Sequence, residues 1–343
     1  MDRYPVFIIK KETVMSEKIV LFGYGAVGQA VVQQLSDAGR PVTVAQRSRP
    51  AVLPPLASYS ACDVKDLAAS KAAVAGANAV ICAIGLTYDG AIWSRDWPVV
   101  MSNLLDACAA SGARLVFVDN LYMYGPQTRP LTEDMPLTTH GIKPRVRAEI
   151  TQLWQAAHAA GKVKVVAVRA SDFYGPGVTQ SVLGETGLAA MVKGKPALLL
   201  GSADLQHDLA YVPDVARATI TLLDAPMDAY GQAWHVPCAP TRTYRQILQI
   251  GADTLGQTLK VSVLPAFMLG ILGFFMPILR EMKEMRFQSD RPYLVDASRF
   301  AKRFWSDATP FEIGIARAIQ SFDSPNLRLF DQQLAYTMPN DQK

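Results

Sequence analysis

The segment Gly23-Tyr24-Gly25-Ala26-Val27-Gly28 constrains the fold of this chain more than any other feature of the sequence. It follows an apolar run at 19–22 and precedes a helical pattern of apolar residues at 27, 31, 32 and 35. A second apolar run at 42–45 closes a strand–helix–strand unit. In this context a GxGxxG segment is typical of a turn that binds a pyrophosphate at the start of a helix.

Each glycine of the segment has its own physical role. Gly23 allows the tight turn, Gly25 lets the backbone approach a phosphate, and Gly28 lets the helix pack closely on the strand. The unpaired N–H groups at the start of the helix then face the ligand. We therefore expect a dinucleotide to bind at Gly23, Gly25, Ala26, Val27 and Gly28. The alternative is a glycine turn that holds no ligand.

Strand and helix patterns alternate through the first half of the chain. Further apolar runs lie at 79–83, 115–118 and 163–168, and helical stretches lie at 64–75, 97–111 and 145–160. This alternation predicts an α/β fold, a Rossmann-type doubly wound parallel sheet. From about residue 170 the pattern is less regular and richer in Gly and Pro, which favours a smaller C-terminal α/β substrate lobe. We expect an N-terminal extension (1–15), the dinucleotide domain (16–170), the lobe interleaved with the sheet (171–325) and a tail (326–343).

The residues after the second strand indicate which dinucleotide binds. An NAD site usually has an acidic residue there that accepts from the ribose 2′-hydroxyl. This chain has Arg47, Ser48 and Arg49 and no acid at that place. Arginine can bind a phosphate through two parallel hydrogen bonds, so the sequence favours NADP over NAD. The alternative is that both arginines are solvated loop charges.

Other strand ends provide further candidate cofactor contacts. Asp63 and Val64 follow the third strand, where Asp63 is a candidate acceptor for the adenine amino group; alternatively, it caps the next helix. Ala83 and Gly85 follow the fourth strand and are candidates for lining the ribose and nicotinamide.

Composition excludes several classes of function. The net charge is only +4 and the sequence contains no long run of Lys and Arg, so the charge does not indicate binding to nucleic acid. The four cysteines form no CxxC pair, and Asp204, His207 and Asp208 lack a well-spaced third ligand, so we expect no metal. We expect a thiol-reduced, cytoplasmic protein.

The N-terminal segment and one apolar stretch bear on location. Residues 1–14 lack the apolar core of a signal peptide, and Met15 is a plausible natural start. Residues 261–279 are uncharged and approach the length that spans a bilayer. They contain two prolines and two glycines, so we favour a buried or substrate-facing helix, and membrane association stays open.

Four further segments, in order and correctly spaced, resemble the extended short-chain dehydrogenase/reductase superfamily of the epimerase/dehydratase type. They are Val116–Pro126, Arg169–Gly177, Asp208–Ala216 and Pro292–Asp296. The resemblance covers roughly residues 18–322. It implies a nicotinamide cofactor held by the Rossmann half, a small-molecule substrate over it, and a homodimer formed through the helices at 97–111 and 145–160.

The chain departs from that superfamily at its usual catalytic residues. The resemblance implies a Ser or Thr, a Tyr and a Lys four residues later, but none of the twelve tyrosines has a lysine at that spacing. The aligned positions fall on Asn120, Gly141 and Arg145, or on Thr139 and Lys143 with a shift of two. Tyr122 is our candidate proton donor, and His140 is the second choice. Asn120 would orient a substrate hydroxyl, and Arg145 would contact the cofactor ribose.

The substrate is less constrained. Trp93, Tyr124, Asp172 and Tyr174 are candidate substrate contacts, although packing is the alternative for both tyrosines. The superfamily tends to have Asn where this chain has Asp172, which weakens a nucleotide-diphosphate interpretation. We favour an NADP-dependent oxidoreductase acting on a small or moderately apolar carbonyl or alcohol. The alternatives are a sugar or nucleotide-sugar epimerase or dehydratase with tightly held cofactor, and a non-catalytic NADP(H) sensor or scaffold.

Overall fold

The central sheet consists of seven parallel strands in a doubly wound order. The computed structural model describes residues 17–264 and 281–323. The strand order is β11-β6-β5-β4-β1-β2-β3, and every neighbouring pair is parallel. The bounds are β1 Ile19–Phe22, β2 Val42–Gln46, β3 Ala57–Ala61, β4 Ala79–Cys82, β5 Arg114–Asp119, β6 Val165–Arg169 and β11 Ala233–His235. The predicted Rossmann-type sheet is confirmed.

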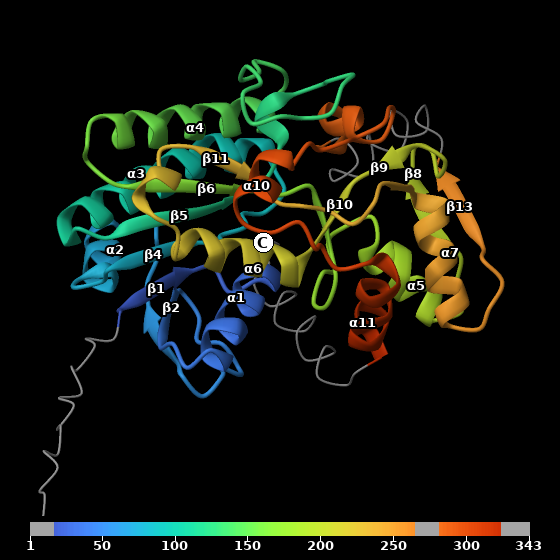
Figure 1. Ribbon diagram of the computed structural model, residues 1–343, viewed down its shortest axis with the longest axis horizontal. Coiled ribbons are helices and arrows are strands. Elements are labelled where there is room, and N and C mark those ends of the chain that lie inside the picture. The colour runs from blue at the N-terminus through green and yellow to red at the C-terminus, as the bar shows by residue number, and fades with distance from the viewer. Residues whose placement is uncertain (1–16, 265–280, 324–343) are drawn as a thin grey trace, which may run out of the picture.

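Helices cover both faces of this sheet (Figure 1). On one face lie α1 (Ala26–Asp37) and α6 (Val212–Leu223); on the other lie α2 (Leu67–Val74), α3 (Gly90–Ser111) and α4 (Lys143–Ala159). Side chains alternate along β1, so that Ile19 and Leu21 join the first core and Val20 and Phe22 the second. The central strands β1 and β4 are apolar throughout because both of their faces are covered, whereas the edge strand β3 is partly exposed and contains Ser58 and Ser60.

A smaller lobe packs beside the carboxyl ends of the strands (Figure 1). It has three short strand pairs: β7 (Asp172–Tyr174) with β10 (Leu209–Tyr211), β8 (Ala197–Leu200) with β13 (Val261–Leu264), and β9 (Gln206–His207) with β12 (Arg242–Thr243). Its helices are α5 (Ala189–Val192), α7 (Tyr244–Thr254) and α11 (Phe311–Asp323), while α10 (Ser298–Arg303) packs near β11. Because α6 and β11 belong to the Rossmann half, the chain passes between the two parts more than once.

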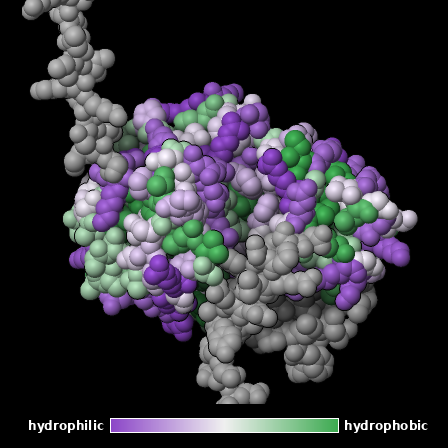
Figure 2. Space-filling model, turned by 90° about the horizontal axis from the view of Figure 1, so that it is seen from below, coloured by the Kyte–Doolittle hydropathy of each residue, from purple (hydrophilic) through white to green (hydrophobic). Residues whose placement is uncertain are grey.

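The uncharged stretch at 261–279 is described only in part. Residues 261–264 form β13 rather than a helix, and residues 265–280 lie outside the described part, as do the predicted extension and the tail from 324 onward. Among the helices of the described residues, none is long and apolar enough to span a membrane. On the face shown in Figure 2, hydrophilic residues are interspersed with small hydrophobic groups.

Candidate active site

The glycine loop has the shape that a pyrophosphate site requires. Gly23 has φ +92°, and a Cβ there would lie 2.5 Å from the Ala83 carbonyl oxygen. A Cβ on Gly28 would lie 2.0 Å from the Gly23 carbonyl oxygen. At Gly25, by contrast, no atom lies within 4 Å of the added Cβ. Gly25 is also the residue before α1, and no side chain caps that helix. The loop therefore leaves open space beside the free N–H groups of Ala26 and Val27, where a phosphate fits.

The basic residues after β2 are exposed at the same edge of the sheet. The Tyr59 hydroxyl donates to the Arg47 carbonyl oxygen at 2.9 Å. The Arg49 guanidinium lies 5.9 Å from the centre of the Tyr59 ring. In the described part of the chain, neither Arg47 nor Arg49 forms an ion pair, so both guanidinium groups are available to a ligand.

The segment after β3 differs from one expectation. The N-cap of α2 is Asp66, which accepts from the backbone of Ala68 and Ala69. Asp63 instead accepts from the Lys65 backbone at 3.0 Å, so its predicted alternative role as the cap is wrong. The Val64 carbonyl accepts from Asn103 at 2.9 Å. Asp63 and Val64 therefore form an ordered turn after β3. The adenine contact of Asp63 stays a prediction, as do the cofactor contact of Val64 and the ribose and nicotinamide contacts of Ala83 and Gly85.

Aromatic residues after β4 and β5 form one wall of the candidate site. Tyr122 stacks on Trp93 with ring centres 6.2 Å apart, and Tyr88 meets Trp93 edge-on at 5.8 Å. The Trp93 indole donates to the Thr87 carbonyl at 2.9 Å. Asn120 accepts from the Tyr122 backbone at 3.0 Å and so fixes the turn that holds Tyr122. Burial and the charge of Asp172 raise the pKa of Tyr122, so its hydroxyl stays protonated.

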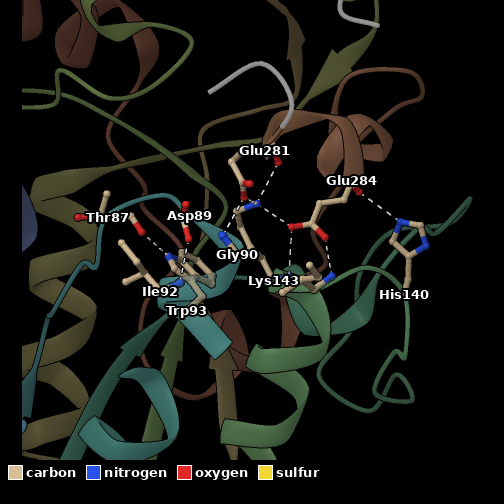
Figure 3. Close-up of polar contacts among 10 residues, drawn as sticks. Thr87, Asp89, Gly90, Ile92, Trp93, His140, Lys143, Glu281 and Glu284 are labelled. Atoms are coloured by element: carbon tan, nitrogen blue, oxygen red, sulfur yellow. Dashed lines mark hydrogen bonds and ion pairs between the residues drawn. The ribbon is translucent and has the colours of Figure 1, made fainter. Parts of the chain in front are cut away.

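A buried lysine lies next to this wall (Figure 3). The Lys143 side chain is 0% exposed, and its ammonium lies 2.6 Å from Glu281 Oε2 and 2.7 Å from Glu284 Oε1. It also lies 4.7 Å from the centre of the Tyr88 ring. Burial alone would raise the pKa of Glu284, but hydrogen bonds from Lys143 and the Ile142 backbone hold it below its usual value. The two carboxylates thus neutralise a lysine that the fold has removed from water.

The same carboxylates hold the starts of two helices. Glu281 accepts from the Gly90 backbone at 2.8 Å, at the start of α3. Glu284 accepts from the Ile142 and Lys143 backbones, at the start of α4. His140, a candidate proton donor, is exposed, and its Nε2 lies 3.2 Å from the Glu284 carbonyl (Figure 3). His140 therefore lies on the outer side of this cluster.

The buried face of α4 differs from the expected alignment by two residues. Lys143 and Arg147 point inward, and the Arg147 guanidinium lies 4.0 Å from the Trp97 ring centre and 3.3 Å from Asp119. Arg145 is 52% exposed and pairs with Glu149 at 3.8 Å. The predicted ribose contact of Arg145 is therefore wrong, because residues 145 and 149 lie on the solvent face of the helix.

Two predicted substrate contacts are packed in cores. The Tyr124 hydroxyl lies 2.6 Å from Arg169 and 2.9 Å from His235, and its ring is 1% exposed. Tyr174 is equally buried, between Tyr211 and Phe311. Neither side chain has surface left for a substrate, so the alternative interpretation as packed aromatics holds for both.

Asp172 remains in the candidate site. Its carboxylate lies 3.0 Å from His207 Nε2 and accepts from Gln288 at 3.1 Å. His207 is therefore engaged by Asp172, whereas Asp204 pairs with Arg245 and Asp208 accepts from Thr241. These three residues, which are close in sequence, thus face different partners and do not converge on a metal.

The sequence interpretation missed several residues of the site: Tyr88, Arg147, His207, Tyr244, Glu281, Glu284 and Tyr293. Only Arg147 had a local signal, since it lies four residues after Lys143 on a helix. Tyr88 lies in the loop before α3, His207 lies in the short strand β9, and Tyr244 begins α7. Glu281, Glu284 and Tyr293 come from the far end of the chain.

The fold and the glycine loop define an α/β protein built to bind a nicotinamide dinucleotide. The model of the "NAD dependent epimerase/dehydratase family" matches residues 19–236, so the chain belongs to that family of nicotinamide-dependent enzymes. No sequence among the curated proteins matches significantly.

Solved structures of similar fold include three sugar-nucleotide enzymes. DesIV, a dTDP-glucose 4,6-dehydratase from Streptomyces venezuelae with NAD and TYD bound, is 17% identical with a TM-score of 0.76 and covers 91% of this chain and 98% of its own. UDP-glucuronic acid 4-epimerase from Bacillus cereus with NAD is 16% identical with a TM-score of 0.73, covering 89% and 98%. UDP-glucose 4-epimerase from Thermus thermophilus with NAD is 19% identical with a TM-score of 0.69, covering 90% and 99%. These likenesses establish the fold.

Proposed function

We propose that this protein binds a nicotinamide dinucleotide and interconverts a hydroxyl and a carbonyl on a sugar or sugar-nucleotide substrate, as an epimerase or dehydratase does. The observation that carries this proposal is the open space at Gly25 between the close contacts of Gly23 and Gly28. Family membership and the named activities of the similar structures favour this reading over the small apolar carbonyl that the sequence favoured.

The bound cofactor would supply the hydride acceptor and donor. Tyr122 is our candidate for the proton step, because it follows β5 at the carboxyl edge of the sheet and its hydroxyl is protonated. Trp93 holds the Tyr122 ring by stacking, and Asn120 holds its backbone. Lys143 and Arg147 occupy the inward positions of α4, where their charges are already paired.

Two measurements test the reaction. Absorbance of the purified protein near 340 nm reports a tightly held reduced cofactor, and acid release of nucleotide reports a tightly held oxidised one. Incubation with a panel of free and nucleotide-linked hexoses then tests turnover, with Tyr122→Phe as the variant that should lose it. A protein that binds cofactor but changes none of the panel would contradict the proposed reaction.

For the cofactor we propose NADP, because Arg47 and Arg49 are unpaired in the described structure and no carboxylate follows β2. The similar structures were solved with NAD, so the test compares both cofactors. A ligand at a hundred times its Kd adds about 2.7 kcal/mol to the stability of the folded state. We expect NADPH to raise the unfolding temperature more than NADH does, and Arg47→Ala to abolish the difference. Equal shifts would contradict the preference for NADP, and a larger shift with NADH would assign NAD.

A second candidate is a cofactor-binding protein without turnover. It is favoured by Gly141 and Thr139, which stand at the two positions where the superfamily resemblance implies a catalytic tyrosine, and by Lys143, whose charge is already ion-paired. Cofactor binding without any turnover, in both the wild type and Tyr122→Phe, would select it.

We also propose a homodimer through α3 and α4, which lie side by side and expose Val99 and Leu153. Light scattering of the wild type and of Leu153→Asp tests it, since a charge in an apolar interface should give a monomer. The cytoplasmic location stays a prediction from the sequence.

A further inference from the structure

Asp172 lies among tyrosines from both halves of the molecule. Tyr88 and Tyr122 come from the Rossmann half, whereas Tyr244 and Tyr293 come from the smaller lobe. The Asp172 carboxylate is one of the causes that raise the pKa of all four hydroxyls, after burial. His207, its hydrogen-bond partner, packs against the rings of Tyr244 and Tyr293 with centres 4.9 and 5.0 Å apart.

The Asp172 carboxylate is held in place yet remains accessible. Each of its oxygens has one hydrogen bond, to His207 or to Gln288. A carboxylate oxygen can accept a second hydrogen bond. The Asp172 side chain is 22% exposed, against 3% for His207. A ligand between the halves would therefore meet the carboxylate rather than the imidazole.

The other charged side chains near Tyr88 are arranged in the same way, with partly exposed carboxylates and buried cations. Glu281 and Glu284 keep 19% and 18% of their side chains exposed, whereas the Lys143 that they bind is fully buried. Arg147 is 6% exposed and contacts Asp119 behind the aromatic wall. Lys143 and Arg147, the two cations that contact the aromatic wall, thus lie behind it, and the carboxylates of Asp172, Glu281 and Glu284 stay partly exposed.

We infer that Asp172, positioned by His207 and Gln288, binds hydroxyl groups of an uncharged, hydroxyl-rich substrate such as a free sugar, and that it excludes a nucleoside diphosphate from this part of the site. Hydroxyls donate to a carboxylate and form charge-assisted hydrogen bonds. The oxygens of a diphosphate can only accept and carry negative charge, so the same carboxylate repels them. This inference rests on the proposed function and narrows its substrate class.

The experiment measures binding of UDP-glucose by calorimetry to protein saturated with NADPH. Asp172→Asn is the test variant, because an amide of the same shape can still hydrogen-bond to Gln288 and His207. Glu312→Gln removes an equal charge from the exposed face of α11 and is the matched control. We expect Asp172→Asn to bind UDP-glucose at least roughly tenfold more tightly than the wild type, and Glu312→Gln to match the wild type.

A parallel titration with free hexoses tests whether Asp172 binds substrate hydroxyl groups, with intrinsic tryptophan fluorescence as the readout. We expect Asp172→Asn to bind the hexose that the wild type binds best roughly tenfold more weakly. The inference is overturned if the wild type binds UDP-glucose as tightly as Asp172→Asn does. It is also overturned if the variant binds hexose as tightly as the wild type. A wild type that gives no thermal shift with NADPH or NADH would instead defeat the proposed function, so the two failures are distinguishable.

Discussion

Lys143 and Arg147 lie one helical turn apart on the buried face of α4, and each is neutralised by a different part of the fold. Lys143 binds Glu281 and Glu284, which follow it by about 140 residues, whereas Arg147 contacts Asp119 at the end of β5. Two buried cations so close together persist only because each has an acidic partner. The start of α4 is therefore fastened both to the sheet and to a distant segment of the chain.

The two glycines of the loop should respond differently to alanine. Gly25→Ala has space for the methyl group and should leave the free energy of unfolding within about 1 kcal/mol of the wild type. It should nevertheless weaken cofactor binding at least roughly tenfold, because the methyl group fills the phosphate space. Gly28→Ala should cost about 2–3 kcal/mol of stability, since its Cβ meets a backbone carbonyl. Denaturant unfolding and NADPH titration measure both effects, and equal stability of the two variants would contradict the loop geometry.

Removal of the Lys143 ammonium should destabilise the protein strongly. Lys143→Met leaves Glu281 and Glu284 close together without a cation, and breaking a buried pair typically costs about 3–5 kcal/mol. Adding Glu281→Gln and Glu284→Gln to this variant removes the repulsion and should restore part of the loss. Urea unfolding of the single and triple variants measures this. A single variant as stable as the wild type would show that the cluster does not hold α4.

The depressed pKa of Glu284 predicts a contribution to stability that depends on pH. A carboxyl group whose pKa is lower in the folded state stabilises the protein above its unfolded pKa, near 4.5, and loses that effect as the pH falls through the folded value. We expect the wild type to lose more stability than Glu284→Gln as the pH falls from 5 toward 3. Parallel slopes of unfolding free energy against pH would contradict this.

His235 predicts a second dependence in a higher pH range. Its Nδ1 lies 3.1 Å from the Asp296 carbonyl and so carries the proton, which leaves Nε2 to accept from Tyr124. Burial, with Arg169 nearby, lowers the pKa of His235 to about 3 from 6.5. The unfolded state therefore binds more protons between these values, and stability falls as the pH drops from 6.5. His235→Gln should flatten the slope between pH 6.5 and 5, measured by urea unfolding.

The parts of the fold that were predicted well are those determined by residues close together in the sequence. The bounds of β1 and the turn at Gly23 follow from neighbouring residues, and the helices expected at 64–75, 97–111 and 145–160 are observed at 67–74, 90–111 and 143–159. The start of α3 was missed because its N-cap, Asp89, precedes a glycine and lies before the apolar pattern.

The site was predicted less well because it is determined by contacts between residues that are far apart in the sequence. Local periodicity places a lysine outside a core, and only Glu281 and Glu284 make the burial of Lys143 tolerable. Counting from a motif gave Arg145, with Lys143 as the alternative, whereas the packing of Arg147 on Trp97 decides which face of α4 is buried. Tyr174 was placed at a substrate because it follows a strand, yet its ring fills the lobe core beside Phe311.

The position of β11 at the edge of the sheet has a consequence for synthesis on the ribosome. This strand pairs with β6, but in the chain the two are separated by β7 to β10 and by α6, which also covers α1. When β6 has left the exit tunnel, one edge of the sheet and one face of α1 still lack their partners. The nascent Rossmann half must therefore wait, exposed to chaperones, until the ribosome has translated the first part of the second lobe, β7 to β10.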